Sequence, residues 1–248
     1  MENPLIRRLE CFVRLSHDDK RLLATAASQR VRRLGPREDI VVEGDPPRDV
    51  SLVLDGWACR YKTLADGRRQ IIAFFLPGDT CDPHAFAVRE MDHSLATLTP
   101  VTIAEIARDT LQDIVDASPR LARALIWTML VTAAVQREWT VSLGQRTAVE
   151  RLGHLLCELF LRLRAVGLTD GPSCELPLTQ VDLGEATGLS NVHVNRVLQE
   201  LRGSGLISLK GRVLTIHDLQ RLQAVALFNA AYLHLDREGR TLDANDAR

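Results

Sequence analysis

The sequence predicts an α+β fold with three successive parts: an N-terminal antiparallel β-roll, one long helix and a C-terminal winged helix-turn-helix. Three observations predict it. Runs of Val and Ile punctuated by glycine fill residues 31–107, a long apolar helical pattern opens at Pro119, and two short helices followed by a hairpin occupy residues 179–216. The predicted parts are a roll domain at 1–118, a long helix at 119–145, a C-terminal domain at 146–235 and a polar tail at 236–248.

Composition and local charge leave binding to nucleic acid open. The 248 residues are 46% hydrophobic and 25% charged, which is normal for a globular protein, and the formal net charge is −1. Nucleic-acid binding depends on local charge, and the stretch from Ser190 to Ile216 has a net charge of +3, from four basic residues and one acid. The four basic residues are Arg196, Arg202, Lys210 and Arg212.

The cysteines and the N-terminus predict a cytoplasmic protein. Five cysteines are scattered along the chain without a CxxC pair, which indicates a reducing compartment rather than a disulfide framework. The N-terminus lacks a basic region followed by an apolar one, and no stretch approaches the roughly 18 apolar residues of a membrane span. We therefore expect no membrane partner.

Residues 31–107 predict a roll of short strands, preceded by short helices within residues 3–30, where Ser16 is a plausible N-cap. Glycines recur every 11 or 12 residues, and two of them follow Asp, which favours hairpins. These glycines are Gly44, Gly56, Gly67 and Gly78. Strands so evenly spaced indicate a closed sandwich or roll. We expect strands at 39–42, 50–54, 57–63, 69–75, 94–98 and 101–107.

A long apolar stripe follows Pro119, and its members recur about every 3.5 residues. They are Leu121, Leu125, Thr128, Thr132, Val135 and Trp139. The helix can pack on its own roll, or it can form a parallel dimer seam. We favour the seam, because so long a stripe needs more cover than one small roll gives. Trp139 can anchor that seam or pack within its own subunit.

The strongest signal is a helix-turn-helix at residues 179–203. A first helix is expected at about 180–187, a sharp turn at Gly188, and a second helix from the N-cap Ser190 to about Leu201. One face of the second helix is apolar, and the other carries amides and an arginine. Arg bonds bidentately to guanine and Asn or Gln to adenine, so this face suits a recognition helix, 190–202, in the major groove.

Two short strands then flank the basic turn Lys210-Gly211-Arg212, which predicts a wing, at 206–216, that contacts phosphate. An ordinary amphipathic helix followed by a hairpin is the alternative. The agreement of helix, turn, helix, wing and charge favours DNA binding. The candidate DNA contacts are Thr179, Ser190, Asn191, Val192, His193, Asn195, Arg196, Gln199, Arg202, Lys210 and Arg212.

The order of these parts resembles the Crp/Fnr family of bacterial transcription regulators. The likeness covers about residues 5–217 and is most specific in the block DLGEATGLSNVHVNRVLQELRGSGLISLKG. It implies a cyclic-nucleotide-binding-like jelly roll with an effector pocket, a homodimer joined through the long helix, double-stranded DNA as a partner and RNA polymerase as a further one. The family's recognition helix commonly has Glu, then Ser or Gly three residues on, then Arg. Here Val192, Asn195 and Arg196 stand there, so the Arg is kept and the Glu is lost.

The segment that matches the family's cyclic-AMP pocket lacks both anchors. In cyclic-AMP-binding members a Gly-Glu pair bonds the ribose, and an Arg-Ser or Arg-Thr pair holds the cyclic phosphate. Asp82-Pro83 and His93-Ser94 stand at those positions here. Pro83 has neither a carboxylate nor an amide hydrogen, and His93 lacks the guanidinium fork. We therefore expect that the chain does not use cyclic AMP.

No cofactor is expected. Iron–sulfur members carry clustered N-terminal cysteines, and only Cys11 lies in that region here. Cys81 and His84 can ligate haem or a metal, or be two scattered polar residues in a loop. Cys157 is expected in the core, with a redox role as the alternative. Cys174, in a loop predicted at 165–175, is the better-exposed thiol for redox sensing.

We expect a dimeric transcription regulator and not an enzyme. The sequence contains no HExxH, no GxSxG, no P-loop and no dinucleotide fingerprint. A small-molecule binding module without a DNA role is the alternative from another class. The lost phosphate anchors argue against that module, and it leaves the winged helix-turn-helix unexplained.

Overall fold

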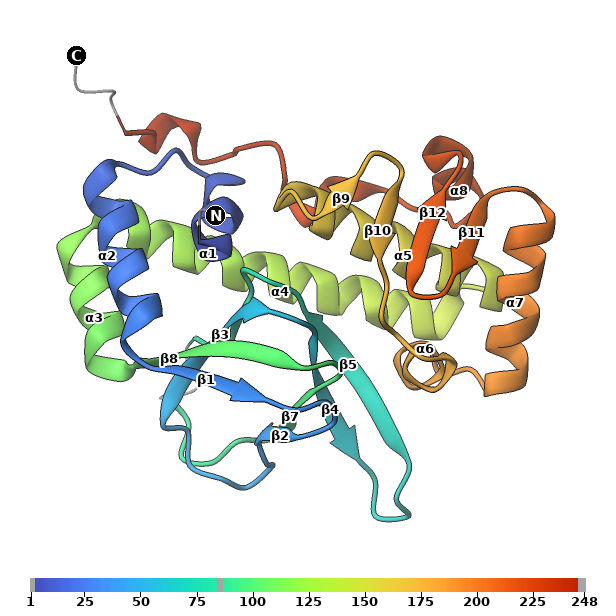
Figure 1. The fold of residues 1–248 in the computed structure, drawn as a ribbon, viewed down its shortest axis with the longest axis horizontal. Coiled ribbons are helices and arrows are strands. Elements are labelled where there is room, and N and C mark those ends of the chain that lie inside the picture. The colour runs from blue at the N-terminus through green and yellow to red at the C-terminus, as the bar shows by residue number, and fades with distance from the viewer. Residues whose placement is uncertain (1–2, 84–86, 245–248) are drawn as a thin grey trace. The chain divides into compact units, whose positions relative to one another are not determined.

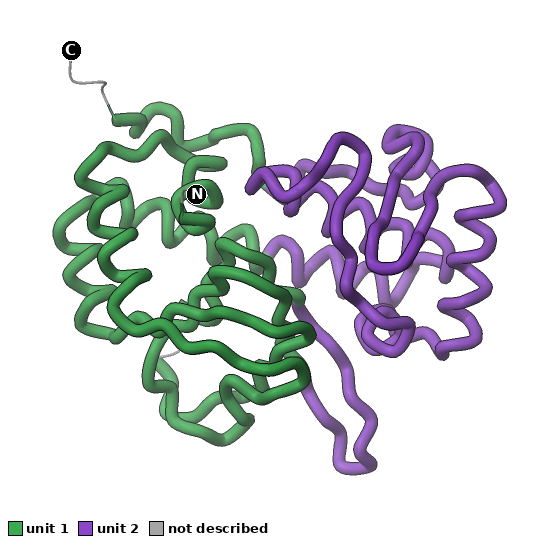
Figure 2. Tube along the Cα trace, viewed as in Figure 1, with its two compact units in different colours: residues 1–61, 74–133, 234–248 green, residues 62–73, 134–233 purple. Residues whose placement is uncertain are grey.

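The computed structural model describes residues 3–83 and 87–244. The chain forms two compact units (Figure 2). Unit 1 contains residues 1–61, 74–133 and 234–248, and unit 2 contains residues 62–73 and 134–233. This grouping differs from the predicted boundaries at both ends: a hairpin of the roll belongs to unit 2, and the C-terminal tail belongs to unit 1. The α+β fold class, with roll, long helix and winged helix-turn-helix, is confirmed.

Unit 1 begins with two capped helices, α1 (Pro4–Glu10) and α2 (His17–Gln29) (Figure 1). Ser16 starts α2 through a capping box: its hydroxyl accepts from the Asp19 N–H, and the Asp19 carboxylate accepts from the Ser16 N–H. Each bond satisfies a backbone donor that the helix itself leaves without a partner. The predicted N-cap at Ser16 is confirmed.

The roll consists of two antiparallel sheets, with strand orders β1-β8-β3-β6 and β2-β7-β4-β5. The strands are β1 (Val31–Leu34), β2 (Asp39–Val41), β3 (Asp49–Asp55), β4 (Ala58–Thr63), β5 (Arg69–Phe75), β6 (Thr80–Cys81), β7 (Ser94–Thr97) and β8 (Val101–Ala107). All six predicted strands form within one or two residues of their expected bounds. Two strands were not predicted: β1, because VRRL lacks an apolar alternation, and β6, because it has only two residues.

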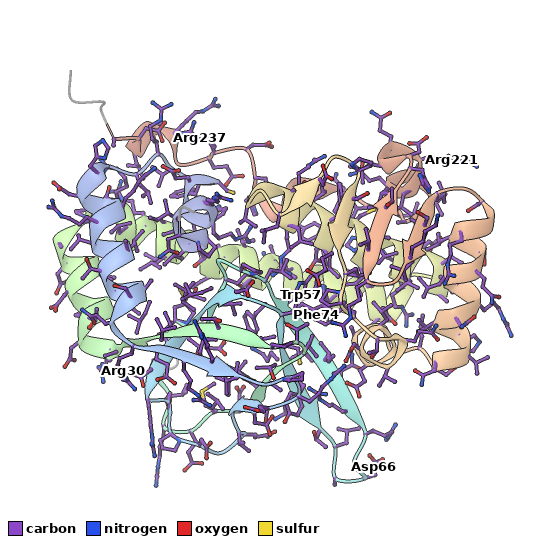
Figure 3. All side chains as sticks on the ribbon, in the orientation of Figure 1. Arg30, Trp57, Asp66, Phe74, Arg221 and Arg237 are labelled. Atoms are coloured by element: carbon purple, nitrogen blue, oxygen red, sulfur yellow. The ribbon has the colours of Figure 1, made fainter. Side chains whose placement is uncertain are left out.

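Both faces of the β3 and β8 pair are buried. Val50, Leu52, Ala104 and Ile106 join a core with α1, α2 and the start of α4 (Pro119–Gln145). In the roll itself, the rings of Trp57 and Phe74 meet edge to face with centroids 6.3 Å apart (Figure 3). Because only 4% of the residues are aromatic, aliphatic side chains fill most of this core.

After β8 come three helices, α3 (Arg108–Ala117), α4 and α5 (Ala148–Ala165). The predicted seam of α4 needs a correction. Four of its six members, Leu121, Leu125, Val135 and Trp139, are buried within the chain itself. A stripe at nearly the opposite side of α4 is exposed instead, because successive helical residues are about 100° apart. Its large apolar members are Ile126, Met129, Leu130 and Val141.

A buried carboxylate organises unit 2. Glu158 of α5 is fully buried and accepts hydrogen bonds from Trp139 Nε1 (3.1 Å), the Tyr232 hydroxyl (2.9 Å) and Arg162 Nη1 (3.2 Å). Trp139 therefore packs inside its own subunit, which was the alternative to a role at the seam. Burial raises the pKa of Glu158, and Arg162 and the two neutral donors oppose that rise.

The rest of unit 2 consists of short elements around α5. They are β9 (Thr169–Asp170), β10 (Ser173–Glu175), α6 (Gln180–Thr187), α7 (Asn191–Gly203), β11 (Ile207–Lys210), β12 (Val213–Ile216), α8 (Leu219–Val225) and the 3-10 helix η2 (Ala230–Leu233). The predicted loop at 165–175 holds two of these strands. Among the described residues, no helix is both long and apolar enough to cross a membrane.

The C-terminal segment is not a free polar tail. It returns to unit 1, where it lies beside α1 and α2 and contains the 3-10 helix η3 (Arg240–Leu242) (Figure 1). Leu242 is half-buried against the unit 1 core. The composition of the segment is polar, but its backbone groups bond to the N-terminal region.

The buried His154 of α5 makes the stability of unit 2 sensitive to acid. Its ring lies against Phe228 and Tyr232, and burial, followed by the charge of Arg146, lowers the pKa of His154 from 6.5 to about 3. Between about pH 6.5 and 3, His154 is protonated in the unfolded chain and neutral in the folded chain. The stability that the neutral His154 contributes to the folded state is therefore complete above pH 6.5. It is lost as the pH falls from 6.5 toward 3.

We predict that His154→Gln makes the free energy of unfolding less sensitive to acid. Between pH 7.5 and 5.0 the wild type should lose about 2 kcal/mol more than the variant, the linkage limit for a histidine kept neutral. Urea unfolding at the two pH values measures this. His217→Gln, at an exposed histidine, serves as the control. Equal acid sensitivity of wild type and His154→Gln would contradict the prediction.

Candidate DNA-binding site

The two helices of the predicted helix-turn-helix have the expected bounds. Thr179 caps α6 through a capping box with Asp182, and Gly188 ends the helix with φ +65°. This left-handed conformation is easy for glycine and costly for other residues. Gly184 allows a second close approach, because a Cβ there would lie 2.6 Å from the Leu189 carbonyl oxygen. The turn thus brings α7 close to α6.

Helix α7 has one apolar and one polar face, as predicted. Its N-cap is Ser190, whose hydroxyl accepts from the His193 N–H. The apolar face is fully buried, and it consists of Val194, Val197, Leu198 and Leu201. Burial of four aliphatic side chains fixes the rotation of α7 about its axis. The opposite face is left to solvent.

The structure brings most of the predicted contacts together on the outer face of α7. Val192 has 70% of its surface exposed, a large value for an apolar side chain. The other exposed members of this face are Asn191, His193, Arg196, Gln199 and Arg202. Asn195 is half-buried, and its amide donates to Gln180 Oε1 on α6 at 3.4 Å.

Thr179 and Ser190 are exposed, but their hydroxyls act as helix caps. Gln180 was not predicted as a site residue. Its position, directly after the Thr179 cap, was the available signal, because the first turn of α6 lies against α7.

The predicted wing also forms. Strands β11 and β12 pair in register from Ile207–Ile216 to Lys210–Val213, and Gly211 turns between them with φ +59°. Lys210 and Arg212 are exposed at this turn. The wing belongs to a four-stranded sheet of order β11-β12-β10-β9. It is thus held on one side by β10, which leaves its basic turn free to contact a phosphate backbone.

Two further segments of unit 2 hold α6. Arg151 of α5 donates from Nη1 to the Thr187 carbonyl oxygen at 2.7 Å, directly before the Gly188 turn. On the roll hairpin, Gln70 donates to the Ala186 carbonyl oxygen at 3.4 Å, and Arg69 lies 3.5 Å from the Glu185 carboxylate. These contacts could not be predicted from the sequence, because they join segments that are far apart in the chain.

In the roll, the residues that replace the two cyclic-AMP anchors contact each other. Asp82 pairs with Arg60, and the His93 Nε2 atom lies 2.8 Å from Asp82 Oδ2. The hydroxyl of Ser94 accepts from the Glu43 N–H at 2.9 Å. Arg60 also stacks over the Phe75 ring at 5.2 Å. Asp82, His93 and Ser94 therefore all bond within the protein itself.

Three of the cysteines considered for a redox or ligand role, Cys81, Cys157 and Cys174, are buried. Cys157 lies in the core, as predicted, and burial raises its pKa to about 12. The prediction for Cys174 was wrong: it lies buried in β10, and burial raises its pKa to about 11. Cys81 is also buried, with a pKa well above its usual value because of burial and then Asp82. His84 lies outside the described residues. In the described part of the chain, no group of three or more His, Cys, Asp or Glu residues could hold a metal ion.

Comparisons with known proteins agree with this organisation. The model of the Crp-like helix-turn-helix domain matches residues 150–225, and the model of the cyclic nucleotide-binding domain matches residues 31–118. Transcriptional activator protein FnrL of Cereibacter sphaeroides is 28% identical over 189 residues, which cover 75% of each chain. Transcriptional activator protein anr of Pseudomonas aeruginosa is 27% identical over 198 residues, which cover 80% of this chain and 81% of that protein.

Among solved structures, FixK2 from Bradyrhizobium japonicum superimposes with a TM-score of 0.71 and 27% identity, and the match covers 79% of this chain and 96% of that one. These relatives are transcription regulators rather than enzymes, as expected for this chain. The chain therefore belongs to the Crp/Fnr family of transcription regulators, with a cyclic-nucleotide-binding-like roll and a Crp-like helix-turn-helix DNA-binding domain.

Proposed function

We propose that the chain regulates transcription as a homodimer that reads a palindromic DNA site without cyclic AMP. The observation that carries this proposal is the outer face of α7. Asn191, Arg196 and Gln199 are exposed there on a helix whose back is fixed in the core, and the basic turn of the wing follows in the same sheet-and-helix domain. A helix so presented fits the major groove, with the wing on phosphate.

The dimer proposal rests on the exposed apolar stripe of α4. Leu130 is 61% exposed and Ile126 is 51% exposed, and Met129 and Val141 continue the same face. Arg137 interrupts it. A row of large exposed apolar side chains along one helix is typical of a surface that another molecule covers. Because a parallel pair of α4 helices covers both stripes at once, a second copy of this chain is the occupant we propose.

Independence from cyclic AMP rests on the network of Asp82, Arg60 and His93. Cyclic AMP needs a carboxylate for its ribose and a guanidinium for its phosphate. Here the only guanidinium in that network is engaged by Asp82. A ligand would have to break this pair before it could bind Arg60, and it would gain little net energy.

RNA polymerase is the further partner we propose, because relatives such as FnrL and anr are transcriptional activators by name.

Selection of bound sequences from random duplex DNA tests the proposed function. Purified protein without added ligand should enrich a pseudo-palindrome with half-sites about one helical turn apart. A parallel selection with cyclic AMP should enrich the same site to the same extent. No enrichment in either selection would contradict DNA recognition, and enrichment only with cyclic AMP would contradict ligand independence.

We predict that Leu130→Glu disrupts the dimer, because it places two carboxylates in the apolar seam. Mass measurement in dilute solution should then give the 27.6 kDa monomer. Thr132→Glu is the matched control: Thr132 is exposed on nearly the opposite side of α4 and belongs to the seam first predicted from the sequence. If Thr132→Glu rather than Leu130→Glu dissociates the dimer, the interface is the seam first predicted from the sequence and not the exposed stripe.

We predict that Arg196 reads a base, whereas Lys210 and Arg212 contact phosphate. Arg196→Ala should cost about 1–3 kcal/mol on the selected site and relax the choice at one base pair. Lys210→Ala should weaken binding to specific and to random DNA alike. It should also reduce the slope of the logarithm of the binding constant against the logarithm of the salt concentration by about one. Competition binding at several salt concentrations separates the two effects. An equal loss on both kinds of DNA for Arg196→Ala would refute its role.

We predict that Val192 changes the half-site at the position where relatives carry Glu. A glutamate there accepts a hydrogen bond from cytosine N4, but valine offers only methyl groups. Valine can therefore contact the thymine methyl, and the half-site should tolerate or prefer T. Val192→Glu should shift the preference toward C. Identical base preferences of wild type and variant at every half-site position would mean that Val192 does not read DNA.

A further inference from the structure

The C-terminal segment from His234 to Ala244, here called the strap, bonds to the N-terminal helices of unit 1. It lies beyond the residues matched by the two family models, which end at 118 and 225. The Arg237 N–H donates to the Cys11 carbonyl oxygen at 3.1 Å, and the Gly239 N–H donates to that of Phe12 at 3.1 Å. The Ala244 N–H donates to the carbonyl oxygen of Arg14 at 3.0 Å. The strap thus follows residues 11–14 in sequence order.

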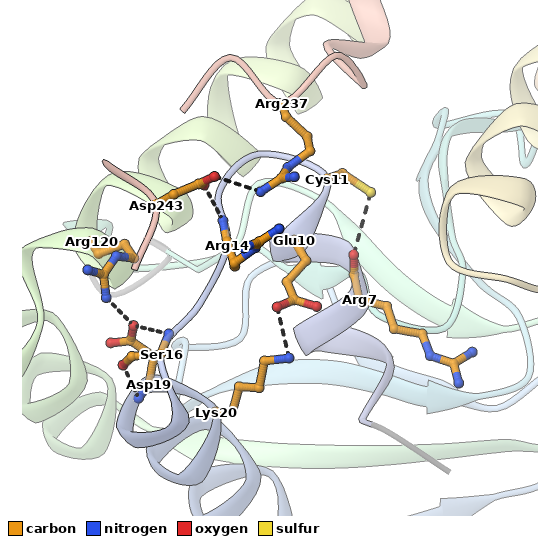
Figure 4. Close-up of polar contacts among 10 residues, drawn as sticks. All are labelled: Arg7, Glu10, Cys11, Arg14, Ser16, Asp19, Lys20, Arg120, Arg237 and Asp243. Carbon is orange, nitrogen blue, oxygen red and sulfur yellow. Dashed lines mark hydrogen bonds and ion pairs between the residues drawn. The ribbon is translucent and has the colours of Figure 1, made fainter. Parts of the chain in front are cut away.

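Side chains fix the strap further (Figure 4). Asp243 accepts from the Arg14 N–H at 2.6 Å and from Arg237 Nη2 at 2.9 Å. Arg120 of α4 donates from Nε to the Leu242 carbonyl oxygen at 2.7 Å and from Nη1 to Asp19 at 2.6 Å. One guanidinium therefore joins the strap to the capping box of α2.

Packing leaves no room for another conformation at the centre of the strap. Gly239 is buried against the Phe12 ring, and a Cβ at this position would lie 2.5 Å from Phe12 Cζ. The Phe12 ring is itself stacked on Trp127 at 5.4 Å, so it has little freedom to move away. Gly239 is thus required for close approach rather than for backbone conformation, since its φ is −84°.

The other end of the strap starts from a firmly held point in unit 2. Leu233 is fully buried, and its neighbour Tyr232 donates to the buried Glu158. Only three residues lie between Leu233 and Arg237, the first residue whose backbone bonds to the N-terminal helices of unit 1, so the link has four Cα–Cα steps. An extended chain spans at most about 3.3–3.6 Å per residue, so this link is at most roughly 14 Å long. The link between the last firmly held residue of unit 2 and the first bonded residue of the strap is therefore short.

We propose that the strap is a clasp that preorganises the DNA-binding domain for simultaneous binding of two half-sites. A palindrome requires both recognition helices of a dimer to be in place at once. A further short tether, besides α4 and the roll hairpin, reduces the orientations that each domain samples, and so raises the effective concentration of the second helix at its half-site. The strap should therefore matter for a palindrome and not for a single half-site. This inference rests on the proposed dimeric DNA binding.

Two strap variants and one control test the clasp. Gly239→Val forces the strap off Phe12, and Asp243→Ala removes the acceptor for Arg14 and Arg237. Thr241→Ala changes an exposed strap residue that carries none of these contacts. Fluorescence anisotropy measures the affinity of each full-length dimer for the selected palindrome and for a duplex with one half-site, and mass measurement verifies that the variants remain dimers. Both strap variants should lose about tenfold in affinity for the palindrome and keep wild-type affinity for the half-site.

Other outcomes overturn the clasp. Unchanged palindrome affinity in both variants means that the strap does not constrain the domain. An equal loss on both duplexes means that the strap only stabilises the fold, and a gain on the palindrome means that it inhibits. If the wild type binds palindrome and half-site equally, the proposed dimeric recognition fails together with the clasp. A preference of the wild type for the palindrome that both strap variants retain refutes the clasp alone.

Discussion

Much of the arrangement of unit 2 depends on the buried carboxylate of Glu158. It bonds to Trp139 of α4, to Arg162 of its own helix α5 and to Tyr232 of η2, so one group joins α4 and the distant η2 to α5. Removing one member of a buried ion pair typically costs about 3–5 kcal/mol, because the remaining charge is left without a partner. The same helix α5 carries Arg151, which holds the carbonyl of Thr187 before the helix-turn-helix turn. The position of the recognition helix and the start of the strap thus share one support.

This support separates the fold of the DNA-binding domain from its specificity. The inner face of α7 is buried and aliphatic, and it sets the helix position. The outer face makes few contacts within the protein, the bond from Asn195 to Gln180 being one of them. Val192 and Arg196 can therefore change without loss of packing, because surface substitutions usually alter stability by less than about 0.5 kcal/mol. A family with this architecture can diverge in its half-sites while it keeps the same scaffold.

Local signals in the sequence were enough for the helix-turn-helix, because its caps and its turn are local interactions. Thr179, Gly188 and Ser190 each act within four residues of their own position. Periodicity alone did not indicate which side of α4 is exposed, for an equally physical reason: apolar residues lie on both sides of that helix, and the protein itself covers four of the six expected seam residues. Cys174 and the strap were missed because pairing of β10 with β12 and bonding to Cys11 and Phe12 join distant segments.

At the positions of the two cyclic-AMP anchors, the roll carries charged and polar groups that pair with one another. A ligand shifts a conformational equilibrium only by the difference in its affinity for the two states. Asp82 bonds to His93 and pairs with Arg60 in the absence of any ligand. Any anion entering there competes with a carboxylate that is covalently held at the site and therefore has a high effective concentration. A ligand that acts through this pocket would therefore have to bind Arg60 more strongly than Asp82 does.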